Sequence, residues 1–234
     1  MKFNVFFRFV WSLNALIILA AGSLSLALLA LSAYSLIRQY TSQTQVSNVV
    51  VSEPPQNNAV STKSLIGNFS KIEGIEIVKA PIYLSQEFQY RYGSKEASSI
   101  QNYIFYDSVQ KSFSLLRSTN QGLILSTIPL PEIDRNPDSN AKVLPIADLY
   151  VIIENDTNND QRITEIDQKS LAIADASGKR FKMLLANMDD FKGASGIKDN
   201  RVSVFYTLAN QLKVSEVDLR SQEIISTTTM EAKR

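Results

Sequence analysis

The sequence predicts an all-β soluble domain preceded by one transmembrane α-helix. The helix is predicted because residues 10–37 contain no charged side chain. At 1.5 Å per residue such a run covers roughly 40 Å, which exceeds the ~30 Å hydrocarbon core of a bilayer. The β domain is predicted because the chain beyond Leu65 consists of short runs rich in Val, Ile, Tyr and Phe, separated by turn residues. A repeated hairpin within these runs supports the same fold class.

The helix and the β-rich part divide the chain into five segments. They are a cytoplasmic N-terminus (1–9), a transmembrane signal anchor (10–37), a flexible polar linker (38–64), an extracytoplasmic all-β domain (65–230) and a C-terminal tail (231–234). The linker is rich in Ser, Thr, Gln and Asn and contains Pro54-Pro55. Such a tract buries too little apolar surface to offset the entropy lost on ordering, so we expect a spacer between bilayer and domain.

The charges that flank the apolar run predict the orientation of the anchor. Lys2 and Arg8 precede the run, whereas Arg38 alone follows it closely. By the positive-inside rule the N-terminus lies in the cytoplasm and the β domain lies outside it, in the periplasm of a Gram-negative cell. A cleaved signal peptide is the alternative. Its apolar region is typically only ~7–15 residues long, so an uncleaved anchor is favoured.

The composition excludes several classes of function. The chain contains no cysteine and no histidine, which removes disulfides, thiolate nucleophiles, the Ser-His-Asp triad and most zinc sites. Beyond Arg38 basic and acidic residues nearly balance, so no electrostatic footprint for nucleic acid is present. From this depleted inventory we expect a domain that is not an enzyme.

A hairpin pattern occurs three times in the soluble part. In each copy an apolar strand ends in Asp, a short turn follows, and an apolar residue lies six positions after the Asp. The Asp residues are Asp107, Asp175 and Asp218, and the apolar residues are Phe113, Phe181 and Ile224. An Asp at this place accepts hydrogen bonds from backbone N–H groups of the turn. Inner strands that pair with the hairpins are predicted at 72–77, 123–125, 150–153 and 202–206.

This repeat resembles the blades of β-propeller proteins over residues 72–228. The second copy follows the first by 68 residues, which requires an insertion at 129–148, and the third follows the second by 43. Propellers close with about four to eight blades, whereas three copies are countable here. The resemblance therefore implies an open sheet assembly or chains that associate to complete a ring. An antiparallel β-sandwich is the alternative.

The acidic loop at 156–167 resembles the calcium loops of EF-hand and dockerin proteins. By this resemblance the ligands of Ca²⁺ are Asp156, Asn158, Asp160, Arg162 (through its carbonyl), Thr164 and Asp167. Ile163 occupies the place of the apolar anchor, and Gln161 replaces the usual Gly, which costs roughly 1 kcal/mol or more because the turn requires positive φ. An acidic turn without a metal is the alternative.

These observations predict a single-pass, membrane-anchored, extracytoplasmic binding or scaffold domain that is not an enzyme and is stabilised by one calcium ion. Its expected partners are the lipid bilayer and either another protein or a second copy of the chain. One alternative is an accessory subunit of a membrane complex that acts through its helix. Another is a carboxylate-dependent hydrolase on a propeller-like frame, which would need two converging carboxyl groups.

Overall fold

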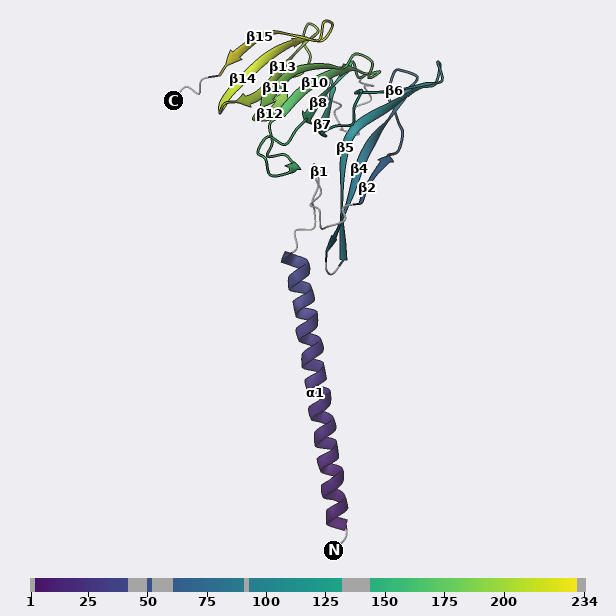
Figure 1. Cartoon of the computed structure of the whole chain (residues 1–234), viewed down its shortest axis with the longest axis vertical. Coiled ribbons are helices and arrows are strands. Elements are labelled where there is room, and N and C mark those ends of the chain that lie inside the picture. Colours follow the sequence, from purple (N-terminus) through teal and green to yellow (C-terminus); the bar gives the residue numbers. More distant parts are fainter. Residues whose placement is uncertain (1–2, 42–49, 52–60, 91–92, 132–143, 231–234) are drawn as a thin grey trace. The chain divides into compact units, whose positions relative to one another are not determined.

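The computed structural model describes the chain except for residues 1–2, 42–49, 52–60, 91–92, 132–143 and 231–234 (Figure 1). The chain divides into two compact units, Met1–Gln45 and Val46–Arg234. The predicted C-terminal tail at 231–234 lies outside the described residues.

The first unit contains helix α1 (Phe3–Thr41), which begins before and ends after the predicted segment 10–37. Within it, Phe7–Tyr34 is long and apolar enough to cross a membrane. Large apolar side chains such as Trp11 and Leu19 are exposed along this stretch. A helix that is apolar on all sides is typical of a membrane span.

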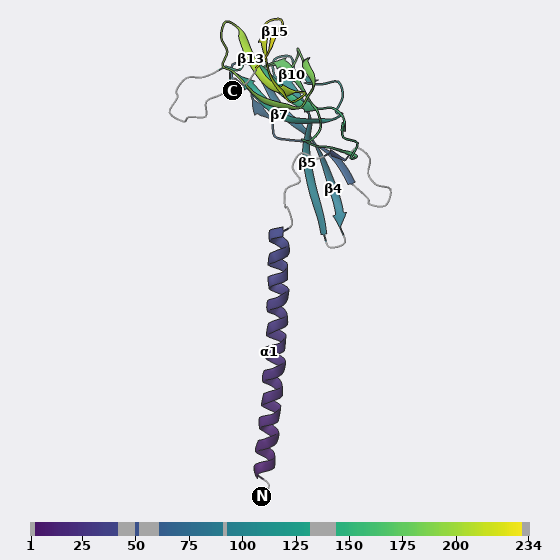
Figure 2. The same cartoon turned by 90° about the vertical axis from the view of Figure 1, so that its left-hand side faces the viewer.

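The second unit is all-β. Most of its strands form three stacked antiparallel sheets that we call blades, and β1 (Val50–Val51) pairs with β9 (Arg162–Ile163) in a separate two-stranded sheet. Blade 1 has the order β2 (Ser61–Ile66), β4 (Ile77–Tyr90), β5 (Gly93–Asp107) and β6 (Ser112–Leu115), and β3 (Ser70–Lys71) also pairs with β4. Blade 2 has the order β11 (Lys182–Met188), β10 (Lys169–Asp175), β8 (Ala147–Ile153) and β7 (Leu123–Leu130). Blade 3 has the order β12 (Asp190–Ala194), β13 (Arg201–Leu208), β14 (Gln211–Asp218) and β15 (Glu223–Thr229). In blade 1, β4 and β5 form a long hairpin (Figure 2).

The three predicted hairpins are confirmed as β5–β6, β10–β11 and β14–β15, each beginning with a strand that ends in Asp. Asp107 Oδ1 accepts the N–H groups of Val109 and Gln110 at 3.0 and 2.9 Å. Asp218 Oδ1 accepts N–H groups two and three residues on in the same way. Hydrogen bonds from the turn backbone lower the pKa of both carboxyl groups. The Asp in this repeat therefore stabilises the turn by accepting hydrogen bonds from its backbone.

The core consists of two large apolar clusters between the blades and a small third cluster around Leu123, Ile153 and Ile163. The buried side chains between blades 1 and 2 include Tyr103, Phe105, Ile124, Tyr150, Ile152 and Ala174. Those between blades 2 and 3 include Leu149, Val151, Leu171, Ile173, Val204 and Val217. Blade 2 is covered on both faces, and all seven residues of β8 are buried. The sheets thus stack as three layers, which differs from the two layers of a β-sandwich.

The predicted inner strands at 123–125, 150–153 and 202–206 lie in β7, β8 and β13, but the prediction at 72–77 is wrong. Only Ile77 belongs to a strand there, and the preceding residues form a turn in which Gly74 has a φ of 84°. The alternation of Ile and Glu in this stretch has the two-residue period of a strand, but Gly74 allows the chain to turn there instead. Strand β1 (Val50–Val51) and the first four residues of β2 lie within 38–64, the range expected to be a spacer.

Gly178 marks a close approach between blades 1 and 2. A Cβ at this position would lie 2.5 Å from Phe105 Cε2, and its φ is 73°. We therefore expect Gly178→Ala to lower the free energy of unfolding by about 1–3 kcal/mol, measured by thermal or denaturant unfolding. Gly196→Ala is the matched control, because a Cβ there meets nothing within 4 Å. Equal losses in the two variants would contradict the close approach.

Candidate functional site

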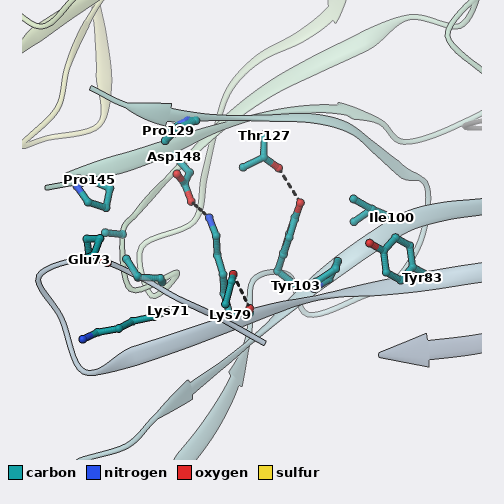
Figure 3. Close-up of a pocket in the computed structure, with 14 residues that line it drawn as sticks. Lys71, Glu73, Lys79, Tyr83, Ile100, Tyr103, Thr127, Pro129, Pro145 and Asp148 are labelled. Carbon is teal, nitrogen blue, oxygen red and sulfur yellow. Dashed lines mark hydrogen bonds and ion pairs between the residues drawn. The ribbon is translucent and has the colours of Figure 1, made fainter. Parts of the chain in front are cut away.

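A pocket of about 410 Å³ lies between blade 1 and blade 2 (Figure 3). Its walls include Lys79, Pro81 and Tyr83 from β4, Ile100 and Tyr103 from β5, Thr127 and Pro129 from β7, and Asp148 from β8. Most of these side chains are rings or aliphatic groups, with a few polar groups among them. This composition is typical of sites for small molecules.

The polar centre of the pocket is an ion pair that joins the two blades. Lys79 Nζ lies 2.6 Å from Asp148 Oδ2. The Asp148 side chain is 4% exposed, and its Oδ2 also accepts a hydrogen bond of 3.2 Å from the Tyr150 hydroxyl. The Lys79 side chain is 23% exposed. The carboxylate is therefore held from two sides in the interior, while the ammonium group remains accessible from the pocket.

Tyr103 forms a second polar link between the blades. Its hydroxyl lies 3.1 Å from Thr127 Oγ1, and Lys79 Nζ lies 5.8 Å from the centre of its ring. That distance is within the range of a cation–π contact. Burial raises the pKa of Tyr103 and raises the pKa of Tyr150 well above its usual value. Both phenols are therefore neutral near pH 7 and contribute hydrogen bonds rather than charge.

None of the pocket residues was among those predicted from the sequence. A signal was nevertheless present, because Lys79 lies within the run IVKAPIYL and Asp148 within ADLYVII. Lys and Asp are seldom buried unless they are paired. Two charges of opposite sign inside apolar strands are thus a candidate pair, but their strands are far apart in the chain.

The acidic loop lies between β8 and β10, and its side chains brace its own backbone. Asp156 accepts the N–H groups of Asn159 and Gln161, each at 2.7 Å, through different carboxylate oxygens. Asn158 and Asp160 each accept the N–H group two residues on, at 2.9 Å. Gln161 has a φ of 66°, as the position of the usual Gly requires.

Asp167 closes the loop from the inside and is completely buried. Its Oδ1 accepts the N–H and the hydroxyl of Thr157 at 2.7 and 3.0 Å, and its Oδ2 accepts the N–H of Thr164 at 2.8 Å. Burial acts to raise the pKa of Asp167, but the hydrogen bonds from Thr164 and Thr157 outweigh it and keep the pKa below its usual value. Ile163 is buried beside Leu123 and Ile153, as expected of the loop's apolar anchor.

Calcium needs about six to eight oxygen ligands, so the loop must direct its oxygens toward one point. Within the described part of the chain, no three acidic side chains are grouped so that they could hold a metal ion. Instead, Asp156 and Asp167 each use both carboxylate oxygens to accept hydrogen bonds from the loop. The loop is thus held by its own hydrogen bonds, and calcium binding stays a prediction from the sequence.

No family model and no curated protein matches this chain. Similar solved structures include the β-propeller domain of the Trilobed protease from Pyrococcus furiosus, at 9% identity and a TM-score of 0.33, over 71% of this chain and 43% of that one. They also include cobalt-substituted apocarotenoid oxygenase from Synechocystis, at 7% identity and a TM-score of 0.31, over 75% of this chain and 40% of that one. This chain therefore spans less than half the length of these structures. The likeness concerns the propeller-like β fold alone.

The prediction that the chain is not an enzyme is corrected by this comparison. The similar structures include an oxygenase and a domain of a protease, so a propeller-like fold gives no ground for that prediction. The missing histidine and cysteine exclude only mechanisms that need those side chains. Carboxylates, lysine and tyrosine also perform acid–base chemistry. Of the two acidic residues that line the pocket, Asp148 is bound to Lys79 and Tyr150, and Glu73 lies on the turn before β4.

The calcium prediction is tested by the melting of the full chain in detergent, with calcium or with a chelator. If the ion binds, calcium at one hundred times its dissociation constant stabilises the domain by about 2.7 kcal/mol and raises the melting temperature. The double variant Asp156→Ala with Asp160→Ala is expected to lose this rise.

Glu165→Ala is the matched control, because Glu165 belongs to the same loop and is not among the predicted ligands. It is expected to keep the full calcium response. Identical melting of the unmodified chain in calcium and in chelator would show that the calcium prediction is wrong.

Proposed function

We propose that this chain is a single-pass membrane protein whose β domain lies outside the cytoplasm and binds a small organic ligand between blades 1 and 2. The observation that carries the proposal is the Lys79–Asp148 pair inside a pocket of about 410 Å³ with largely apolar walls. Burying an ion pair costs desolvation energy that its attraction often fails to repay. Stability alone is therefore a weak reason for this pair, and recognition of a ligand is a stronger one.

The ammonium group of Lys79 indicates the chemistry of the ligand. An ammonium group carries more donor hydrogens than the one that Lys79 gives to Asp148. The remaining donors suit a carboxylate or carbonyl oxygen. The neighbouring surfaces are the ring of Tyr103 and the side chains of Pro81 and Pro129, which suit a ring or a branched apolar body. The ligand class is therefore a compact organic acid with an apolar body.

The fixed position of Lys79 favours binding without large rearrangement. Asp148, which holds the ammonium group, is itself held by Tyr150, and all three residues lie on strands of the blades rather than on loops. A donor that is already in place loses little side-chain entropy when a ligand arrives. The pocket is thus preorganised for an acceptor group.

The proposed location rests on helix α1 and the charges beside it. Phe7–Tyr34 can span the bilayer, and Lys2 and Arg8 precede most of this stretch. Positive charges on the N-terminal side favour a cytoplasmic N-terminus. The β domain then faces the outside of the cell or, in a Gram-negative cell, the periplasm.

This orientation is tested with protease added to sealed, right-side-out spheroplasts. The β domain is expected to be digested without detergent, because its loops then lie on the accessible side. A cytoplasmic protein serves as the control for intact membranes and must survive. Protection of the β domain until detergent is added would contradict the proposed location.

Ligand binding is tested with benzoate and benzylammonium, two probes of similar size and opposite charge. Benzoate is expected to bind the full chain in detergent with a Kd of about 1 mM, equivalent to about 4 kcal/mol, in ligand-observed NMR. Benzylammonium is expected to bind at least about tenfold more weakly, because it has no acceptor oxygen for the remaining donors of Lys79.

The double variant Lys79→Met with Asp148→Asn removes both charges together and leaves no unpaired carboxylate. We expect it to lose benzoate binding. The matched control is Lys182→Met with Glu223→Gln, which removes an exposed pair of 2.9 Å on other strands and keeps binding. Equal binding of both probes, or unchanged binding in the Lys79 variant, would contradict a ligand site at this lysine.

A further inference from the structure

Blade 1 has an apolar face that no other blade covers. The strand register places Ile66, Val78, Ile104, Tyr106, Phe113 and Leu115 on the side opposite to the Lys79–Phe105 side that meets blade 2. We call this side the incoming face of blade 1. Phe113 is 64% exposed, Ile66 59% and Leu115 46%. The same side also carries Ala80, Ile82 and Asn102, which are buried, so the exposed apolar groups of this face are Ile66, Phe113 and Leu115. Large apolar side chains exposed together on one sheet face mark an interaction surface.

The hairpin repeat shows what normally covers this face. Phe181 and Ile224 occupy the same place in their hairpins as Phe113, six residues after the Asp. Phe181 packs into the cluster between blade 2 and the preceding blade 1, and Ile224 into the cluster between blade 3 and the preceding blade 2. Phe113 thus occupies a position that is part of the core in the other two hairpins. In the described part of the chain, however, no blade precedes blade 1.

The residue before the Asp follows the same rule. Ala174 and Val217 are fully buried against the preceding blade. Their equivalent, Tyr106, lies on the incoming face of blade 1 and contacts Phe113, with ring centres 4.6 Å apart. Two positions of the repeat therefore point to a blade that should precede blade 1.

Blade 3 offers the complementary surface at the other end of the stack. Its inner side, with Val204 and Val217, packs on blade 2. By register the opposite side carries Phe205 beside Val214, and Leu212 opposite Thr207. Phe205 and Val214 are half-buried, and Leu212 is 37% exposed. We call this side the outgoing face of blade 3. Ser203, Thr207 and Glu216 lie on the same side, and Glu216 pairs with Arg201 at 3.5 Å. The outgoing face therefore carries three apolar side chains among polar ones.

We propose that two copies of this chain form a closed ring in which the incoming face of blade 1 of each copy packs on the outgoing face of blade 3 of the other. Each contact continues the face-to-face stacking already present at the two internal junctions. Propellers close with about four to eight blades. The described residues form three blades, so two copies supply a number within this range, whereas one copy or three copies do not. A head-to-tail contact made twice closes and leaves neither face exposed.

Cysteine cross-linking tests this arrangement cleanly, because the chain contains no cysteine. Phe113→Cys and Val214→Cys are introduced in separate full-length chains, one of them enlarged by a tag, and the two are co-expressed and purified in detergent. A short bis-maleimide is expected to yield the mixed dimer. Phe113→Cys alone is expected to yield no dimer, because the two Phe113 side chains belong to opposite contacts of the ring.

The mass of the full chain in detergent, measured by light scattering, gives an independent result. The unmodified chain is expected to be a dimer, and Phe113→Glu is expected to halve the protein mass. Val109→Glu is the control, because Val109 is 74% exposed at the turn of the same hairpin. It is expected to leave the dimer intact. A monomeric unmodified chain, a Phe113–Phe113 cross-link, or a dimer without the mixed cross-link would overturn the proposal, and none of these outcomes depends on ligand binding in the pocket.

Discussion

Packing of one apolar sheet face on another is the interaction on which the rest of the β domain depends. Blade 2 shows it most clearly, because its central strand β8 is buried on both faces. At about 25 cal/mol per Å² of apolar surface, such burial is the main favourable contribution to folding. Blades 1 and 3 each have one covered face, so their stability relies on blade 2. Because each apolar sheet face needs a partner, the uncovered face of blade 1 indicates a binding surface.

The candidate pocket lies where this apolar packing is interrupted by charge. Lys79 and Asp148 meet across the junction of blades 1 and 2, beside the tightly packed cluster that contains Phe105 and Tyr150. The connection between the two blades is equally well braced, since buried Asn102 accepts the N–H groups of Tyr103 and Arg117 and donates to the Arg117 carbonyl. A rigid frame on both sides keeps the ion pair in place, which a preorganised site requires.

The residue pattern of the acidic loop is compatible both with calcium binding and with a turn that is held by its own hydrogen bonds. Asp and Asn residues at alternating positions supply the oxygen ligands of a calcium loop. The same side chains also accept hydrogen bonds from the backbone N–H groups of a tight turn. In the structure they satisfy the backbone, and the buried Asp167 carboxylate is the centre of this network. Strand β9 (Arg162–Ile163) of the loop pairs with β1, so the chain that follows the helix is attached to the domain at this loop.

The sequence alone determined the elements whose cause is local. An uncharged run of sufficient length specifies a helix that is long and apolar enough to span a membrane, and an Asp that accepts turn N–H groups specifies each hairpin. The places of α1, Asp107, Asp175 and Asp218 therefore followed from composition and spacing. Tertiary structure decided whatever depends on residues far apart in the chain. The pairing of Lys79 with Asp148 and the exposure of Phe113 both arise from which blade lies beside which. Periodicity describes one strand at a time, whereas burial and ion pairing depend on the neighbouring strand, and this neighbour is chosen by the packing of the whole domain.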